Sequence, residues 1–468
     1  MSRFKINWYI FFFGLVILAG SCKKDALLDD PSAKLSFSTD TLLFDTVFTT
    51  IGSTTHYLKV YNPNKKRVNI SSIKLAGGSN SSFRINVDGI SGLQFSDIEI
   101  PGNDSIFIFV EVTIDPSSGS LPFIVSDSIL FETNGNLQDV QLVAWGQDAH
   151  FFNGNVMCDM TWSNDKPYVI YNSILVDSGC TLTIDPGVLV YSHSYAGIFI
   201  KGTLLVNGTK DETVVFQGDR LESFYDHVPG QWLGIFLLRG SANSVIDHAI
   251  VKNGFYGVSA GSHDNPDLNS FTWANSPNAI IKHTLIQDML YTGIFGFLSQ
   301  LQVENTLVFN CGQHNAHLAF GGNYGFTHVT LANYGNNGID HGDPVLELGN
   351  FAESTQGHFS ADLTASFTNC IIDGSLDEEL GYDDDTFGAF DYLFENCLIK
   401  TQFNTSSSSY VSIIKNQMPS FVSIADIDYQ LLSTSPCIDA GTSTLVLDDL
   451  LGETRDFSPD LGCYEFSP

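Results

Sequence analysis

A six-residue pattern that recurs through the middle of the chain constrains the fold more than any other feature. Each copy begins and ends with an apolar residue and has Asn or His in third place. The copies are Ile246–Val251, Ile281–Ile286, Val303–Val308, Phe326–Leu331, Phe367–Ile372 and Phe394–Ile399. Their first residues lie 35, 22, 23, 41 and 27 positions apart, so two intervals are nearly equal and the others are that interval plus an insertion. A fixed period with loop-sized insertions is typical of stacked coils, and we therefore predict a β-solenoid.

The third position of the pattern holds His248, His283, Asn305, His328, Asn369 and Asn396. Coils stacked in register would bring these side chains into one column. One hypothesis makes the column a stripe of metal ligands or general bases, because His serves both purposes. The other makes it a structural column of polar side chains that hydrogen-bond to one another and to turn carbonyls. We favour the structural column, because metal ligation requires His and three of the six positions hold Asn.

The charge balance argues against two classes of partner. The chain carries 21 basic and 52 acidic residues, a formal net charge of −31, so nucleic acid and anionic lipid surfaces would be repelled. No Lys or Arg occurs from His283 to Ile399. Such a surface suits divalent cations, neutral glycans or solubility alone.

The N-terminus has the pattern of an export signal. Two basic residues precede an apolar run, Trp8 to Ala19, that is short for a membrane span. The small residues just before Cys22 resemble the lipobox of bacterial lipoproteins. The resemblance implies that residues 1–21 are a signal peptide, that Cys22 is acylated after cleavage, and that residues 22–32 form a tether. An uncleaved anchor and ordinary secretion are the alternatives.

The residues after Cys22 bear on the membrane to which the protein is anchored. Inner-membrane lipoproteins usually carry Asp directly after the acylated Cys, and this chain has Lys23 there. The resemblance therefore implies a lipid anchor in the outer membrane of a Gram-negative bacterium. Whether the protein faces outward is left open.

Two all-β domains are expected, because 468 residues exceed one compact core. Residues 33–148 alternate short strands with turns, which fits an Ig-like β-sandwich of seven or eight strands. Asn62-Pro63, Ile100-Pro101-Gly102 and Ala144-Trp145-Gly146 resemble segments of hydin-type Ig-like domains. The resemblance implies a spacer or interaction module.

Residues 160–466 are predicted to form the solenoid. Short apolar strands such as Ile198–Ile200 and Leu204–Val206 end at Gly or Asn, as the strands of a coil do. The chain closes with Ser-Pro-Cys-Ile-Asp-Ala-Gly at 435–441 and Asp-Leu-Gly-Cys-Tyr-Glu at 460–465. This ending resembles that of bacterial right-handed parallel β-helix repeat proteins, which have the pectin-lyase-like fold. The resemblance implies the fold and says little about function, because one fold carries many functions.

Seven cysteines remain if Cys22 carries lipid, so at least one thiol is unpaired. Cys370 and Cys397 hold the same place in the repeat and would lie about 4.8 Å apart, which permits either a disulfide or stacked buried thiols. A disulfide between Cys437 and Cys463, which would pin the end of the chain, is a further hypothesis. No spacing of Cys and His indicates zinc.

Four inserted loops are the expected places for binding, because loops on a rigid scaffold commonly carry it. They are residues 219–230, 261–273, 341–360 and 375–391. The second loop has a polar and aromatic set suited to a ligand: His263, Asp264, Asp267 and Trp273. The fourth loop has a set of carboxylates that would repel one another unless solvated or bridged by a cation: Asp377, Glu378, Asp383, Asp384 and Asp385. A calcium site and a solvated acidic loop are the alternatives, since calcium tolerates irregular oxygen geometry.

Two segments rich in histidine would form a ligand cluster if their coils align. They are His314-Asn315-Ala316-His317 and His341-Gly342-Asp343. Exposed polar turns are the alternative, and the sequence favours them because such turns need no partner.

The sequence has no nucleophile elbow, P-loop or dinucleotide-binding pattern. We therefore predict a non-catalytic cell-surface protein that binds glycans, adheres to surface proteins or serves structural display. The alternative is a carbohydrate-active enzyme, a polysaccharide lyase or glycoside hydrolase, with its site between inserted loops. An acidic polysaccharide would be repelled by the acidic face, whereas glycoside hydrolysis needs only two carboxylates. A purely architectural spacer is the third hypothesis.

Overall fold

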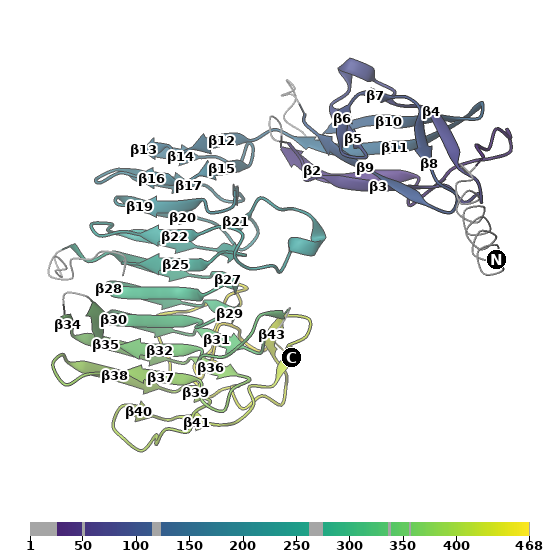
Figure 1. Cartoon of the computed structure of the whole chain (residues 1–468). Coiled ribbons are helices and arrows are strands. Elements are labelled where there is room, and N and C mark those ends of the chain that lie inside the picture. Colours follow the sequence, from purple (N-terminus) through teal and green to yellow (C-terminus); the bar gives the residue numbers. More distant parts are fainter. Residues whose placement is uncertain are drawn as a thin grey trace, which may run out of the picture. The chain divides into compact units, whose positions relative to one another are not determined.

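The computed structural model describes residues 26–48, 52–114, 123–261, 275–335, 338–354 and 357–467. The chain divides into two compact units, Met1–Asp148 and Ala149–Pro468. The first is a β-sandwich and the second a parallel β-helix, so the predicted fold class is confirmed (Figure 1). The second unit begins with strand β12 (His150–Asn153), ahead of the predicted start at residue 160.

The predicted signal peptide, Cys22 and the first residues of the predicted tether lie outside the described residues. Within the described ranges, no helix has the length and the apolar character that crossing a membrane requires.

Two mostly antiparallel sheets form the sandwich. The first runs in spatial order β1 (Ser36–Phe37), β3 (His56–Tyr61), β9 (Ser105–Val112), β5 (Phe83–Val87) and β6 (Ile90–Gly92). The second runs in spatial order β2 (Thr41–Phe48), β11 (Asn136–Gln147), β10 (Phe123–Thr133), β4 (Val68–Leu75) and β7 (Gln94–Phe95). Strand β8 (Ile98–Ile100) also pairs with β4, and the 3₁₀ turn η1 (Gly78–Asn80) follows β4 in the sequence. Alternate residues such as Leu58, Ile85 and Ile108 point inward and fill one shared core, which explains the period-two pattern of the sequence.

Three faces make up the solenoid, and each coil supplies one strand to each face (Figure 1). The first face consists of β13 (Val156–Met157), β16 (Ile174–Val176), β19 (Gly197–Ile200), β22 (Gly234–Leu237), β25 (Tyr256–Ala260), the first halves of β28 (Thr292–Glu304) and β30 (Ala316–Thr327), β32 (Leu346–Gly349) and β37 (Leu380–Asp383). The second face consists of β14 (Met160–Trp162), β17 (Thr181–Ile184), β20 (Thr203–Asn207), β23 (Ser244–Asp247), β26 (Asn278–Lys282), the second halves of β28 and β30, β35 (Leu363–Thr368), β38 (Phe390–Glu395) and β40 (Tyr410–Val411).

The third face is a separate parallel sheet. It consists of β12, β15 (Tyr168–Asn172), β18 (Leu189–Ser192), β21 (Val214–Gly218), β24 (Ala249–Lys252), β27 (Leu285–Met289), β29 (Leu307–Cys311), β31 (Thr330–Asn333), β36 (Ile371–Gly374), β39 (Leu398–Ile399) and β41 (Ile414–Lys415). The remaining elements are the 3₁₀ turn η2 (Ser223–Tyr225), the hairpin β33 (Phe351–Ser354) and β34 (Gly357–Ser360), and the pair β42 (Phe421–Ser423) and β43 (Asp428–Leu431).

The predicted polar column lies where the second face turns into the third. Strand register pairs the preceding residues, Asp247 with Lys282 and Lys282 with Glu304, so His248, His283 and Asn305 follow one another coil by coil. All six column residues have positive φ, between 42° and 56°. Asn and His tolerate this left-handed conformation better than most residues. The left-handed turn therefore explains why Asn and His recur at this position, and the in-register stacking of coils is confirmed.

A C-terminal clamp, residues 421–466, covers this column and the outer side of the third face. Asn396 Nδ2 donates to Ala440 O at 2.9 Å, Asn369 Nδ2 to Thr442 O at 2.7 Å, and Asn305 Nδ2 to Asp448 O at 2.7 Å. Apolar clamp residues pack on outward side chains of the third face in a second core: Leu307, Phe309, Ile371, Leu398, Tyr429, Leu431, Cys437, Leu461 and Cys463. The characteristic ending of the sequence therefore serves the fold.

The cysteines differ in part from expectation. Cys370 and Cys397 are stacked free thiols, since the Cys370 backbone N–H donates to Cys397 Sγ at 3.4 Å. The proposed Cys437–Cys463 disulfide is wrong, because both residues are buried free thiols within the clamp. One disulfide that was not predicted joins Cys158 and Cys180, 22 residues apart and therefore one coil apart.

Replacing Asn369 with Ala should lower the free energy of unfolding of the solenoid by about 2–4 kcal/mol. The substitution removes the two hydrogen bonds that join Asn369 to Thr442 and places a Cβ without local hydrogen bonding at φ 56°. Urea unfolding monitored on the solenoid transition measures the loss. Asn369→Gly is the matched control and should cost less, because Gly adopts positive φ freely. An Ala variant as stable as the Gly variant would contradict the conformational part of the argument.

Candidate carbohydrate site

Inserted loops border the first face of the solenoid on both sides. Residues 219–233 and 334–345 connect the third face to the first, and residues 261–277 and 350–362 connect the first face to the second. The fourth predicted loop, 375–391, contains β37 of the first face with a turn at each end. All four predicted loops thus attach beside the first face, which favours that face as the place for a ligand.

One column of outward side chains runs along the first face. Because side chains alternate between the two sides of a strand, the column is defined by pairing of equivalent residues in successive strands. It reads Phe199, Phe236, Ser259, Phe295, His317 and Glu347. The column therefore changes from aromatic to ionisable along the solenoid.

Two tyrosines fill the space beside Ser259 and make the aromatic part continuous. Ring centroids lie 5.0 Å apart for Phe199 and Phe236, 6.0 Å for Phe236 and Tyr256, 5.5 Å for Tyr256 and Tyr291, and 6.1 Å for Tyr256 and Phe295. We call these five residues the aromatic strip. Phe295 is buried, whereas Tyr291 is 37% exposed and the other three are half-buried. Phe295 and Tyr256 also pack against the buried cluster of Phe297, Leu298 and Phe320. The exposed surface of the strip is therefore mainly that of Tyr291, Phe199 and Phe236.

Histidines connect the aromatic strip to Glu347. The rings of Phe295 and His317 lie 5.5 Å apart, edge to face, and those of His317 and His314 lie 4.7 Å apart. His314 Nδ1 donates to the carbonyl of Pro344 at 2.7 Å. Its Nε2 lies 3.8 Å from Glu347 Oε2, too far for a hydrogen bond.

Burial raises the pKa of Glu347 above its ordinary value. Nearby His314 opposes the rise, and the carboxylates of Asp383 and Asp343 add to it. The His314–Glu347 ion pair alone would lower the pKa, but at 3.8 Å it is weaker than the desolvation. Gly381 leaves room for this carboxyl group, because a Cβ there would stand 2.5 Å from Glu347 Oε2. Glu347 is therefore an acid that holds its proton more strongly than an exposed glutamate does.

A second outward carboxylate stands diagonally from Glu347. Register pairs Glu347 with Gly381 and Gly349 with Asp383, so Asp383 is one strand across and two residues along. With strands about 4.8 Å apart and a rise of about 3.3 Å per residue, the two Cα atoms lie about 8 Å apart. Desolvation raises the pKa of Asp383 as well, and Asp384 adds to the rise.

This arrangement supports two kinds of chemistry. Aromatic rings bind the apolar faces of sugar rings, while neighbouring polar groups bind hydroxyls. Two neighbouring carboxyl groups can also serve as general acid and general base where their pKa values differ. Inverting glycoside hydrolysis requires about 6.5–9.5 Å between the carboxyl groups themselves. The Cα spacing of about 8 Å meets that requirement if the Glu347 and Asp383 side chains extend in parallel from the face.

A separate concavity of about 410 Å³ lies on the outer side of the second face. Its polar lining is mostly neutral amides: Asn243, Asn278, Gln300, Gln302 and Asn323. The Asn278 side chain is engaged, because its Oδ1 accepts the backbone N–H of Asn243 at 2.7 Å. The concavity therefore offers amide donors and acceptors and no charge.

One set of predicted site residues lies outside the described residues, and a second set is divided by strand β37. His263, Asp264, Asp267 and Trp273 lie outside the described residues. The five acidic residues of the fourth loop are split between the two ends of β37, with Asp377 and Glu378 before the strand and Asp383, Asp384 and Asp385 at or after its end.

The acidic residues also have separate partners. Glu378 accepts the backbone N–H groups of Leu380 and Gln402, at 3.1 and 2.8 Å. Asp385 contacts His358 and Ser360 of the β33–β34 hairpin. Among the described side chains, the one group with three ligands close enough for a metal ion lies elsewhere, at Asp247, His248 and His283. Calcium in the fourth loop stays a prediction.

The two histidine segments, residues 314–317 and 341–343, have different neighbours. His314 belongs to the Glu347 environment described above. His341 has its Nε2 3.2 Å from Glu379 Oε2, and both side chains are almost fully buried. His314 and His341 therefore face different carboxylates, Glu347 and Glu379, and do not form the predicted shared ligand cluster.

The aromatic strip and Glu347 were missed by sequence reasoning. The repeat pattern marks the end of the second face and the following turn, so it fixes the register there. The first-face strands are separated from it by insertions of unequal length. Gly-Ile-Phe at 197–199 and again at 234–236 was a usable signal, because it repeats the outward Phe.

Comparisons with known proteins leave the family open. No protein-family model and no curated protein matches the chain. Among solved structures, the chain is similar to a family 123 glycoside hydrolase from Clostridium perfringens, described for glycolipid glycan hydrolysis, at 9% identity and a TM-score of 0.19, over 26% of this chain and 30% of that one. It is also similar to the catalytic domain of a GH87 α-1,3-glucanase in complex with nigerose, at 10% identity and a TM-score of 0.17, over 77% and 93%. At these TM-scores neither likeness carries an argument about this site.

The pH dependence of stability tests the environment of Glu347. Because the pKa of Glu347 in the folded state lies above the ordinary value of 4.5, the folded protein binds more protons than the unfolded chain. This proton binding stabilises the folded state at low pH, and the stabilisation is lost as pH rises through the folded-state pKa. Glu347→Gln should therefore gain in Tm relative to wild type between pH 4 and pH 7. In a His314→Gln background the gain should be larger, since His314 opposes the shift. A difference in Tm that stays constant with pH would contradict the assigned burial.

Proposed function

We propose that this protein is a cell-envelope lipoprotein that binds a neutral glycan along the first face of its β-helix. The observation that carries the proposal is the aromatic strip, in which five rings from adjacent coils lie in mutual contact between the bordering loops. Rings spaced by successive coils match a ligand with a repeating unit. A linear glycan is such a ligand.

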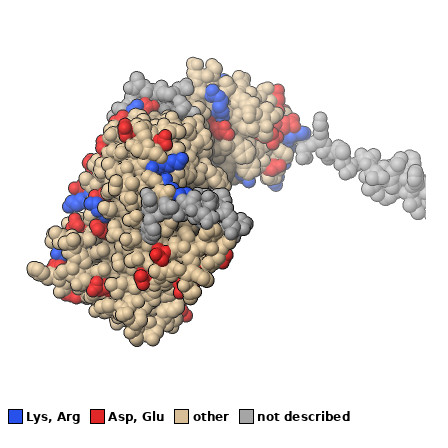
Figure 2. Space-filling model, turned by 90° about the vertical axis from the view of Figure 1, so that its left-hand side faces the viewer, with Lys and Arg blue, Asp and Glu red and all other residues tan. Residues whose placement is uncertain are grey.

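Charge supports a neutral glycan over an acidic one. No Lys or Arg occurs from His283 to Ile399, the segment that contains Glu347, Asp343 and Asp383. An acidic polysaccharide laid on the first face would approach these carboxylates without a compensating cation. Figure 2 shows a face of the molecule on which most residues carry no charge and on which both acidic and basic side chains are scattered.

Removing an aromatic ring from the strip should weaken glycan binding. Phe236→Ala and Tyr256→Ala should each raise Kd by about tenfold, the effect of losing a ring from a well-packed contact. Affinities are measured by calorimetry with the glycan that binds most tightly on an array of neutral oligosaccharides. Phe457→Ala is the control, because Phe457 is 96% exposed on the clamp and should leave Kd unchanged. Equal changes in Kd for all three substitutions would show that the strip is not part of the binding surface.

Glycoside hydrolysis is the second candidate function, favoured by the raised pKa of Glu347 beside Asp383. In that reaction the Glu347 carboxyl group would donate its proton to the glycosidic oxygen. The Asp383 carboxylate would take a proton from the water that attacks the anomeric carbon from the opposite side. The leaving sugar departs as an alcohol and the other sugar gains the hydroxyl group.

Activity separates the two functions. The binding proposal expects no release of oligosaccharides when the pure protein is incubated with the bound glycan. If the protein is a hydrolase, we expect products with inverted anomeric configuration. Glu347→Gln should then lower kcat by about 100-fold or more while Kd changes little. Product release that survives Glu347→Gln would exclude Glu347 as the proton donor.

The lipid anchor belongs to the same proposal and has its own test. Cys22→Ala should abolish labelling of the protein by a fatty acid in cells and should move it from the membrane to the soluble fraction. Ser21→Ala is the control, because it keeps a small residue before the cysteine and should keep the label. The β-sandwich would then act as a spacer between the anchor and the β-helix. Labelled protein in the Cys22→Ala strain would contradict the assigned anchor.

A further inference from the structure

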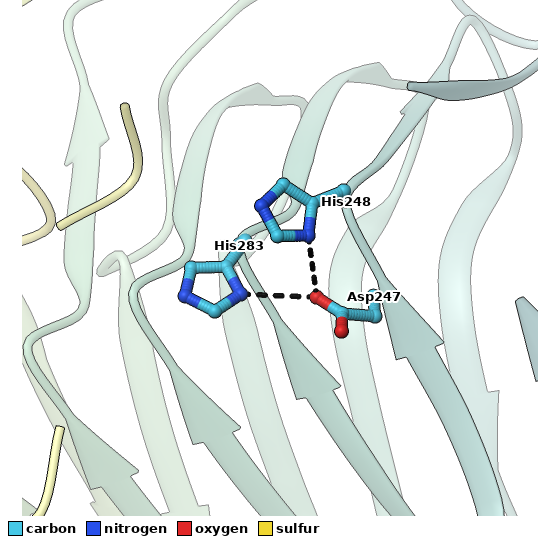
Figure 3. Close-up of side chains that lie close together, drawn as sticks. All are labelled: Asp247, His248 and His283. Carbon is cyan, nitrogen blue, oxygen red and sulfur yellow. Dashed lines mark hydrogen bonds and ion pairs between the residues drawn. The ribbon is translucent and has the colours of Figure 1, made fainter. Parts of the chain in front are cut away.

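Two imidazoles from neighbouring coils share one carboxylate oxygen. Asp247 Oδ1 lies 2.7 Å from His248 Nδ1 and 3.0 Å from His283 Nδ1 (Figure 3). The two rings are stacked, with centroids 4.4 Å apart and planes inclined by 23°. Elsewhere, at His150 and His193, one imidazole faces one carboxylate. The shared oxygen therefore distinguishes this place from the ordinary histidine pairs of the solenoid.

We propose that Asp247, His248 and His283 bind one divalent ion of a late first-row transition metal, of which Zn²⁺ is the type. The ligands would be the two Nδ1 atoms and Asp247 Oδ1, which lie within 4.8 Å of one another. Imidazole nitrogen and carboxylate oxygen are the usual non-sulfur ligands of Zn²⁺, at about 2.0–2.2 Å. Ligand atoms in tetrahedral coordination stand about 3.3 Å apart. The two distances from Asp247 Oδ1, 2.7 and 3.0 Å, would therefore open slightly to admit an ion.

The backbone positions these ligands before any ion binds. His248 and His283 occupy consecutive places in the polar column, with φ of 48° and 46°. Register pairs Asp247 with Lys282, which fixes the rise from one coil to the next. The side chains of the three ligands are 11–21% exposed, so an ion can reach them from solvent.

A second carboxylate supports the ligand role of His283. Its Nε2 faces Asp448 Oδ1 at 3.4 Å, from the C-terminal clamp. Metal-bound histidines usually donate their other ring N–H to a carboxylate or carbonyl oxygen, which fixes the tautomer that leaves the first nitrogen free for the metal. Asp448 is itself placed by the hydrogen bond from Asn305 to its carbonyl. A metal ion here would join two coils and, through Asp448, the clamp.

The ammonium group of Lys282 should weaken metal binding at this site. Its Nζ lies 3.1 Å from Asp247 Oδ2, the oxygen that does not face the imidazoles. The ammonium therefore leaves Oδ1 open to a metal ion but repels the ion's charge. Removing this ammonium should tighten metal binding.

The third histidine of the column lacks these features. His328 follows Thr327 instead of a carboxylate, and burial together with the guanidinium of Arg455 lowers the pKa of His328 to about 3. Its Nε2 accepts a hydrogen bond from Asn369 Nδ2 at 3.0 Å. His328 therefore provides a matched control from the same column.

Titration of the full-length, tag-free protein with Zn²⁺ and Co²⁺ at pH 7.5 tests the proposal. We expect one equivalent to bind, with the visible absorption of four-coordinate Co²⁺ and no thiolate charge-transfer band. His248→Asn and His283→Asn should each weaken binding by more than about tenfold, and Lys282→Gln should strengthen it. These Asn variants should fold, because Asn holds the same position in three other coils. Melting curves without metal establish this.

His328→Asn should leave the affinity for Zn²⁺ and Co²⁺ unchanged. The proposal is overturned if the wild-type protein binds no equivalent of either ion, or if His248→Asn and His283→Asn bind it as the wild type does. If an Asn variant does not fold, Asp247→Asn replaces it in the same comparison. Glycan affinity is measured in parallel and should be unaffected, which separates this site from the aromatic strip.

Discussion

The hydrogen bonds that hold the polar column in register are the constraint on which the rest of the structure depends. Each column residue turns the chain through a left-handed conformation and donates its backbone N–H to the next coil, as His248 does to Lys282 O at 3.2 Å and His328 to Thr368 O at 3.0 Å. Because side chains alternate along a strand, a slip of one residue would turn the core residues outward. The column thus fixes which side chains fill the interior and which form the aromatic strip.

The clamp also provides hydrogen-bond acceptors for the Asn side chains of the column. Asn side chains that project from the turns are satisfied by carbonyls of residues 440–448, so polar groups at the corner stay paired after burial. Arg455 is almost fully buried and donates to Asn305 Oδ1 at 2.9 Å and to Glu465 Oε2 at 2.9 Å. Burial lowers the pKa of Arg455 and neighbouring carboxylates oppose this, so the guanidinium and its partners depend on one another.

The sequence reveals the parts of the fold that repeat locally. Asn and His at the left-handed turns and apolar residues at fixed offsets are visible without coordinates, which is why the β-helix and its column could be predicted. The disulfide could also have been found, since Cys158 and Cys180 are one coil apart. The Glu347 site could not, because it combines side chains from several coils, and the insertions between those coils conceal their register.

The position proposed for the glycan-binding face follows from where the coil accepts insertions. From Asp247 onward, the corner between the second and third faces is only one or two residues long and is covered by the clamp. An added loop there would break both the hydrogen-bonded column and the clamp contacts. The corner between the third and first faces has a polar column of its own, formed by Asn253, Asp288 and Asn310. Farther along the solenoid the same corner carries residues 334–345, and the corner between the first and second faces carries the hairpin β33–β34. Both corners border the first face, so the insertions of this chain gather beside the aromatic strip and Glu347.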